Sequence, residues 1–106
     1  MSSPTSAFSA IADPTRRQIL DLLHIAGPMK AGELAKQFPQ ITRPAVSKHL
    51  RILRGASLVR REARGRESWY FVELMPLQEV YAWMQQYEEF WTDRLLALKK
   101  AVENPD

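Results

Sequence analysis

Residues 42–66 read TRPAVSKHLRILRGASLVRREARGR and contain the signals of a basic helix followed by a hairpin. Thr42 is a favourable N-cap, Pro44 stands in the first turn that would follow it, and Gly55 suits a helix end. Apolar residues recur at helical spacing within this segment, at Val46, Leu50 and Leu53. The pattern predicts an amphipathic helix over residues 42–54 with one buried stripe.

The cations of this helix share one polar arc opposite Val46. A helix fits the major groove of B-DNA, where base edges accept hydrogen bonds from Arg, Lys and Ser and the flanking phosphates attract cations. We predict groove contacts near the helix start and phosphate contacts later, from Thr42, Arg43, Pro44, Ser47, Lys48, Arg51 and Arg54. His49 is a further candidate at the edge of the arc, with a structural role as its alternative. For the whole helix the alternative is a solvated basic face.

After the helix, the sequence period changes towards that of a strand. Residues 58–63 and 67–72 flank Arg64-Gly65-Arg66, and the second segment is rich in aromatic and β-branched residues. This pattern predicts a β-hairpin with a basic tip. We expect Arg64 and Arg66 to reach a phosphate or the minor groove beside the helix site.

Two helices are predicted upstream, close to the basic one. Asp13 and Pro14 start a helix over residues 14–26, which Gly27-Pro28 ends, and a shorter helix follows over residues 30–38. Only a few residues then separate it from Thr42, a spacing typical of a helix-turn-helix. Residues 6–12 suit a short helix that presents Phe8 and Ile11, and residues 1–5 are expected to be flexible.

Positive charge is concentrated in one part of the chain. The 106 residues carry a net charge of +3 and a pI near 9.5, and the length fits a single domain over residues 1–106. Residues 42–66 hold eight basic side chains against Glu62 alone, whereas residues 73–106 hold seven acidic and three basic ones. This asymmetry is the footprint of a polyanion-binding surface with an acidic segment facing away from it.

Several classes of function lack the residues that they need. The sequence has no cysteine and only two distant histidines, His24 and His49, so we expect no disulfide, metal site or cofactor. No Ser-His-Asp set, phosphate-binding Gly loop or evident carboxylate pair suggests an enzyme. No apolar run approaches the roughly 18 residues of a membrane span, and we expect a soluble, cytoplasmic protein without a membrane partner.

Residues 76–103 are predicted to form one long helix with more apolar surface than a small domain can cover. Positions 77, 81, 84, 88, 91, 95, 98 and 102 advance by alternating steps of four and three, and all but Glu88 are apolar. The surplus predicts a homodimer interface from Phe8, Ile11, Trp83, Met84, Tyr87, Trp91, Leu95 and Leu98. An alternative use of Trp83, Tyr87 and Trp91 is to enclose an apolar effector.

Four segments together resemble ArsR-type winged-helix transcriptional repressors: ADPTRRQILDLL (12–23), GELAKQF (32–38), RPAVSKHLRILRGASLV (43–59) and RREARGRESWYFV (60–72). The closing segment, PLQEVYAWMQQYEEFWTDRLLALKKAVE (76–103), resembles the metal-independent branch. The resemblance implies a mainly α winged helix-turn-helix fold that dimerises through its terminal helices on a palindromic operator in double-stranded DNA. Residues 42–54 would be the recognition helix and residues 58–72 the wing.

Two positions depart from the family pattern. Metal-sensing members carry thiolate pairs where this chain has Leu34, Ala35 and Lys36, or His and carboxylate sets on a last helix that here has no His. Ser57 stands where the family usually has Gly, so we expect Gly55 to take the left-handed conformation or the helix to end differently.

A rival function is a winged-helix interaction module whose basic face binds an acidic protein.

Overall fold

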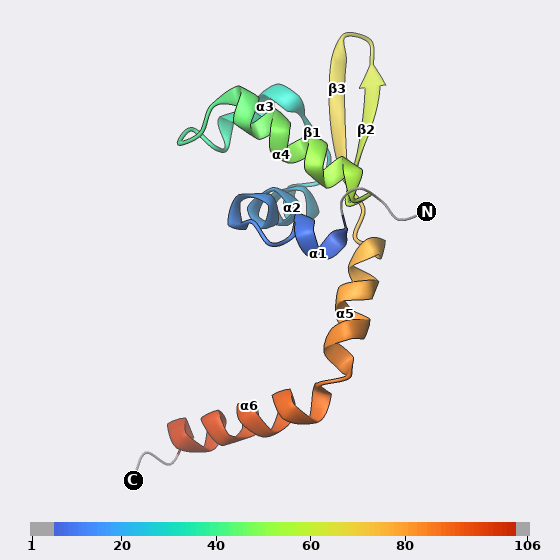
Figure 1. The fold of residues 1–106 in the computed structure, drawn as a ribbon. Helices are drawn as coiled ribbons and strands as arrows, with labels where there is room; N and C mark the ends of the chain where they lie inside the picture. The colour runs from blue at the N-terminus through green and yellow to red at the C-terminus, as the bar shows by residue number, and fades with distance from the viewer. Residues whose placement is uncertain (1–5, 104–106) are drawn as a thin grey trace.

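The computed structural model describes residues 6–103 as a helical body with a small antiparallel sheet (Figure 1). Expected and observed architecture agree: a mainly α fold with a hairpin. The elements in chain order are α1 (Ala7–Ala10), α2 (Pro14–Ala26), β1 (Met29–Lys30), α3 (Ala31–Lys36), α4 (Arg43–Gly55), β2 (Val59–Arg64), β3 (Glu67–Val72), the 3-10 helix η1 (Met75–Leu77), α5 (Gln78–Gln85) and α6 (Glu88–Glu103). The expectation for residues 1–5 lies outside the described residues.

The helices α2 and α4 begin as their capping residues predict. Asp13 Oδ2 accepts a hydrogen bond from Arg16 N at 3.1 Å, and Thr42 Oγ1 accepts one from Ala45 N at 3.2 Å. In each helix a proline occupies the first turn, where a missing N–H leaves no bond unmade. These caps fix the residue at which each helix begins.

The predicted stripe of α4 lies in the core of the molecule. Val46, Leu50 and Leu53 are almost fully buried and belong to the same apolar cluster as Ile19 of α2 and Leu34 of α3. The core therefore holds α2, α3 and α4 together and turns the opposite face of α4 outward.

The end of α4 differs from the expectation for Gly55. Gly55 is the last residue of the helix, and Ser57 adopts the left-handed conformation, with φ +61°. Ser57 N–H donates to Arg54 O at 3.0 Å and Leu58 N–H donates to Leu53 O at 2.9 Å, the two bonds of a Schellman motif. Buried Leu53 and Leu58 accompany this motif, so the hydrogen bonds and the core hold Ser57 in a conformation that suits glycine better.

The sheet has the order β1-β3-β2, with both pairs antiparallel. The predicted hairpin is confirmed: Val59 pairs with Val72 and Arg64 with Glu67, and Gly65 takes a positive φ in the two-residue turn. We call β2, β3 and this turn the wing; it projects from the helical body (Figure 1). Strand β1 is not expected from the sequence, because its two residues are too few to show a period, and the helix predicted over residues 30–38 covers only Ala31–Lys36.

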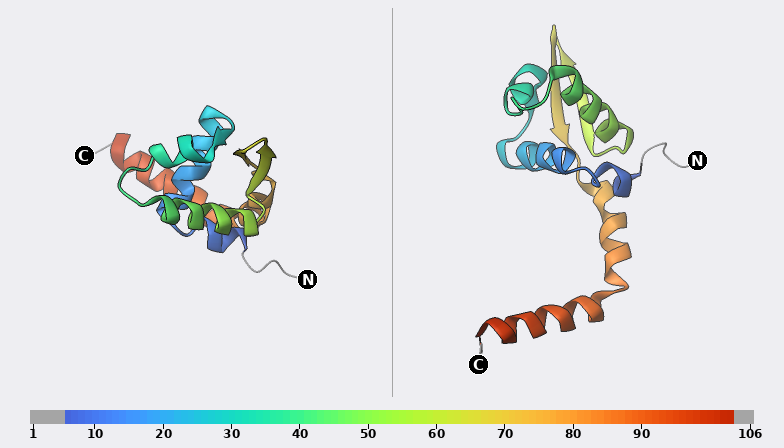
Figure 2. Two further views of the ribbon diagram at one scale, coloured as in Figure 1. Left: turned by 90° about the horizontal axis from the view of Figure 1, so that it is seen from above. Right: turned by 60° about the vertical axis from the view of Figure 1, so that its left-hand side comes forward.

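The prediction of one helix over residues 76–103 is wrong, since η1, α5 and α6 follow one another with a break at Gln86 and Tyr87. At the break Gln86 Nε2 donates to Trp83 O at 3.0 Å, a side-chain bond of the kind that competes with helix continuation. Figure 2 shows α6 turning sharply away from α5. The spacing of apolar residues persists across the break, which is why sequence periodicity did not reveal it.

Candidate nucleic-acid interface

The outward face of α4 gathers most of the predicted DNA-contacting residues. Val46, Leu50 and Leu53 anchor the helix, and the side chains that stay exposed around it are Arg43, Pro44, Ser47, Lys48, Arg51 and Arg54, with Arg43 at the edge beside Gly32 of α3. Thr42 is also exposed, at the N-cap. Four cations and one hydroxyl therefore stand on a single rigid helix face, able to meet base edges and phosphates together.

His49 lies apart from this surface. Its Nδ1 is 3.4 Å from Arg16 Nη1 and 4.0 Å from Asp13 Oδ2, so the ring faces the start of α2. Arg16 also donates through Nε to Ala10 O at 2.7 Å, at the end of α1. The geometry gives His49 the structural role considered from the sequence, joining α4 to α1 and α2.

The Asp13 carboxylate is the acidic member of this cluster. Its partial burial raises the pKa, but the hydrogen bond from Arg16 N and the nearby His49 and Arg16 outweigh it, and the pKa lies below its ordinary value. Asp13 therefore remains ionised at neutral pH, where it caps α2 and attracts both neighbours.

The outer face of the wing is a self-contained network of arginines, one acid and aromatic rings. Glu62 accepts hydrogen bonds from Arg60 at 3.1 Å and from Arg64 at 3.3 Å, and these two bonds lower the pKa of its carboxyl. The Arg60 guanidinium lies 4.4 Å from the centre of the Phe71 ring, and Arg64 lies 5.3 Å from that of Trp69. Arg64 is thus partly committed to the wing itself, whereas Arg66 is exposed in the turn.

The inner face of the wing presents an arginine that sequence reasoning did not select. Side chains alternate along β2, so Arg61 points to the face opposite that of Arg60 and Arg64. Its Nε donates to Ser68 Oγ at 3.0 Å, which orients the guanidinium and leaves both terminal nitrogens available. The period of two along residues 59–64 was the available signal, because it places Arg61 on the same face as buried Val59.

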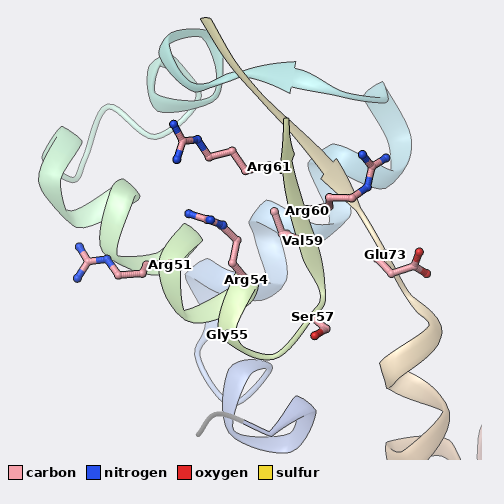
Figure 3. A pocket seen from close by; sticks show the side chains of 8 residues that line it. All are labelled: Arg51, Arg54, Gly55, Ser57, Val59, Arg60, Arg61 and Glu73. Atoms are coloured by element: carbon pink, nitrogen blue, oxygen red, sulfur yellow. The ribbon is translucent and has the colours of Figure 1, made fainter. Parts of the chain in front are cut away.

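A hollow of about 680 Å³ separates the end of α4 from the base of the wing (Figure 3). Its arginines are Arg51 and Arg54 from α4 and Arg60 and Arg61 from β2. Figure 3 shows Arg51, Arg54 and Arg61 on one side of β2, whereas Arg60 extends to the other side, where Glu73 also lies. The hollow is therefore strongly cationic on the side that α4 faces.

The chain matches a family model described as a helix-turn-helix domain over residues 11–62. It is 40% identical to "Transcriptional repressor SdpR" of Bacillus subtilis over 77% of this chain and 89% of that protein. It is also 36% identical to "HTH-type transcriptional regulator Rv2034" of Mycobacterium tuberculosis, over 96% of this chain and 91% of that one.

Solved structures show the same relationship. A crystal structure of an ArsR family transcriptional regulator, RHA00566, superimposes with a TM-score of 0.69 at 36% identity, covering 80% of this chain and 86% of that chain. An ArsR-like transcriptional regulator from Rhodococcus sp. RHA1 superimposes with a TM-score of 0.64 at 32% identity, covering 88% and 86%.

These relatives confirm that the chain is a regulator and not an enzyme, as its residues predicted. None of the helices within residues 6–103 is long and apolar enough to cross a membrane. The outward helix of a helix-turn-helix, the adjoining wing and the likeness over most of the chain converge on one conclusion. The chain belongs to the ArsR-type winged-helix transcriptional regulators and binds DNA.

Proposed function

We propose that the protein is a homodimeric transcriptional repressor that binds a palindromic operator, with α4 in the major groove and the wing alongside it. The observation that carries this proposal is the exposed surface of α4, which holds Arg43, Ser47, Lys48, Arg51 and Arg54 while Val46, Leu50 and Leu53 are buried. A rigid helix with this arrangement can place several donors against base edges at once, while neighbouring cations neutralise phosphates.

The aromatic surface formed by α1, α5 and the break after α5 supports the dimer. Phe8 packs edge-on against Trp83, with ring centres 5.9 Å apart, and Trp83 packs against Tyr87 at 5.4 Å. All three rings remain exposed, as do Met84, Trp91, Leu95 and Leu98 among the predicted interface residues. Ile11 is half-buried against the core of its own protomer. A contiguous apolar surface of this kind is typical of a protein interface.

The shape of the molecule supports the same assignment. The radius of gyration is 17.6 Å, against about 13 Å for a compact domain of 100 residues. The excess comes from α5 and α6, which extend from the end opposite the wing (Figure 1). Tyr81, Met84, Trp91 and Leu95 line a hollow of about 320 Å³ across the break, a concave apolar surface that a helix of a second copy would fill.

Two copies related by a two-fold axis present two recognition helices. Such helices read half-sites about 34 Å apart, one helical turn of DNA, and the symmetry of the pair requires a palindrome. The name of the relative SdpR supports repression as the outcome, which an operator within a promoter would produce by excluding the transcription machinery.

The proposal is tested by titrating the protein with duplexes recovered from genomic DNA at several salt concentrations. A dimer that neutralises about eight phosphates should lose affinity with a log–log salt slope near −7. A flat salt response with the recovered duplex overturns the proposal. If no duplex binds at moderate salt and an acidic protein binds instead, the basic face serves as an interaction module.

Arg43 and Arg64 should contribute in different ways. We expect Arg43→Ala to relax operator sequence preference because Arg43 stands at the start of α4. Arg64→Ala should weaken binding to all sequences alike because Arg64 lies at the tip of the wing. Competition between operator variants measures both effects, and an equal loss for both variants across all operators would contradict this division.

A further inference from the structure

We propose that Arg51, Arg54 and Arg61 form a binding site for a backbone phosphate of DNA, which we call the arginine cleft. The inference rests on the proposed function and deepens it, because it assigns the DNA phosphate that lies between the recognition helix and the wing to an arginine of β2 as well as to α4. The ligand is a phosphodiester group of the strand that passes between the groove read by α4 and the next groove.

The first support is a local excess of positive charge without a matching acid. Arg51, Arg54 and Arg61 border one side of the same hollow, and no ion pair with a carboxylate is found for any of them within residues 6–103. Glu73 also lines the hollow, but it extends on the Arg60 side and accepts a hydrogen bond from Met75 N at 3.2 Å. A phosphate would balance the positive charge gathered around this hollow.

The second support is the fixed orientation of Arg61. Its Nε is held by Ser68 Oγ, so the two terminal nitrogens project from the inner face of the wing. A guanidinium presented in this way can bind a phosphate with two parallel hydrogen bonds, a geometry that lysine cannot reproduce. Arg60 provides the contrast, because Glu62 and the Phe71 ring already engage its guanidinium.

The third support is position. Arg51 and Arg54 lie in the second half of α4, away from the end that enters the groove, and Arg61 faces them from the base of the wing. A sugar-phosphate strand separates the major groove from the minor groove, so the space between α4 and the wing is where it passes. The arginine cleft therefore fixes the register of the protein on DNA and carries little sequence information.

The test compares Arg61→Ala with Arg60→Ala, two neighbouring substitutions that remove the same charge from opposite faces of β2. In a dimer, Arg61→Ala should weaken binding to every duplex roughly 10- to 100-fold and reduce the salt slope by about 2. Arg60→Ala should cause less than half of that change in slope. Arg61→Lys should keep the slope and recover only part of the affinity, and Ser68→Ala should lower affinity with the slope retained.

A scan of the operator with single neutral methylphosphonates locates the phosphate. The wild type should lose roughly tenfold in affinity at one or two adjacent positions of each half-site, and Arg61→Ala should abolish that sensitivity while Arg60→Ala retains it. If the wild type binds the operator but both variants keep the same methylphosphonate pattern, the arginine cleft is overturned and the proposed function stands. If the wild type binds no duplex at all, the proposed function itself fails. Thermal unfolding of each variant establishes that the fold is kept.

Discussion

A single residue, Ser57, carries a conformational cost in this fold. A left-handed conformation is unfavourable for residues with a Cβ by about 1 kcal/mol, and Ser57 adopts it so that the chain can leave α4 and enter β2. We expect Ser57→Gly to increase the free energy of unfolding by about 0.5–1 kcal/mol, measured by urea denaturation. Ser57→Ala is the matched control and should change stability little, because it retains the Cβ. A loss of stability with glycine would show that the Ser57 side chain outweighs its backbone strain.

Asp13 links the stability of α2 to pH. Because its pKa is lowered in the folded state, its electrostatic contribution is present above the ordinary carboxyl value of about 3.9 and is lost as pH falls through the lowered pKa. Asp13→Asn keeps the capping oxygen and removes the charge. We expect the wild type to be more stable than this variant at pH 7 and to lose the difference in acid, as measured by unfolding across pH.

Asp13→Ala, which removes the cap as well, should cost about 1 kcal/mol at neutral pH. A constant stability difference between wild type and Asp13→Asn from pH 7 to pH 2 would contradict the assignment of charge interactions to His49 and Arg16.

The roles of single residues could be predicted from the sequence where one strong local preference acts. Thr42 and Asp13 were predictable caps because few residue types satisfy free N–H groups at a helix start. The backbone conformation of Ser57 and the contacts of His49 depend on tertiary packing. The sequence placed Ser57 at a family glycine position and left a structural role open for His49, but only the core that buries Leu58 and the meeting of α2 with α4 decide both.

The two faces of the wing differ in their contacts. On the outer face, Glu62 forms ion pairs with Arg60 and Arg64 and restrains both side chains. Glu62→Gln removes the negative charge and weakens the restraint on Arg60 and Arg64. We expect it to raise affinity for duplex DNA several-fold at low salt, with the gain shrinking as salt increases. Fluorescence anisotropy with a labelled operator checks this. Glu79→Gln on α5 removes the same charge far from the wing and should have little effect, so equal gains would mean that only net charge matters.

Elements with a clear apolar period were predictable, and features without such a period were less so. α4 and the hairpin follow directly from periods of 3.6 and 2. Residues 76–103 keep their apolar spacing through Gln86 and Tyr87, so the pattern gave the helical surface correctly but not the turn between α5 and α6. Strand β1 exists because Met29 and Lys30 lie beside Tyr70 and Trp69, a pairing that only the assembled fold creates.

At the scale of the whole molecule, the terminal helices should decide the oligomeric state. Leu95 is 63% exposed on α6, and Leu95→Glu places a charge within the surface that a second copy would cover. We expect this variant to sediment as a monomer and to lose at least tenfold in operator affinity. Ile25→Glu is the control, since Ile25 is 84% exposed on α2. A dimer that survives Leu95→Glu would place the interface elsewhere.

The Schellman motif between α4 and β2 has a consequence for how the protein would dissociate from DNA. Residues 56–58 are the whole linker, and its backbone hydrogen bonds to Leu53 and Arg54 and the burial of Leu58 hold it in place, so we expect α4 and the wing to behave as one rigid unit. An effector that releases the protein from DNA would then not need to deform this unit. In the proposed dimer, a change of the angle between α5 and α6 at Gln86 and Tyr87 would instead alter the distance between the two copies of α4, so that they no longer match successive turns of the double helix.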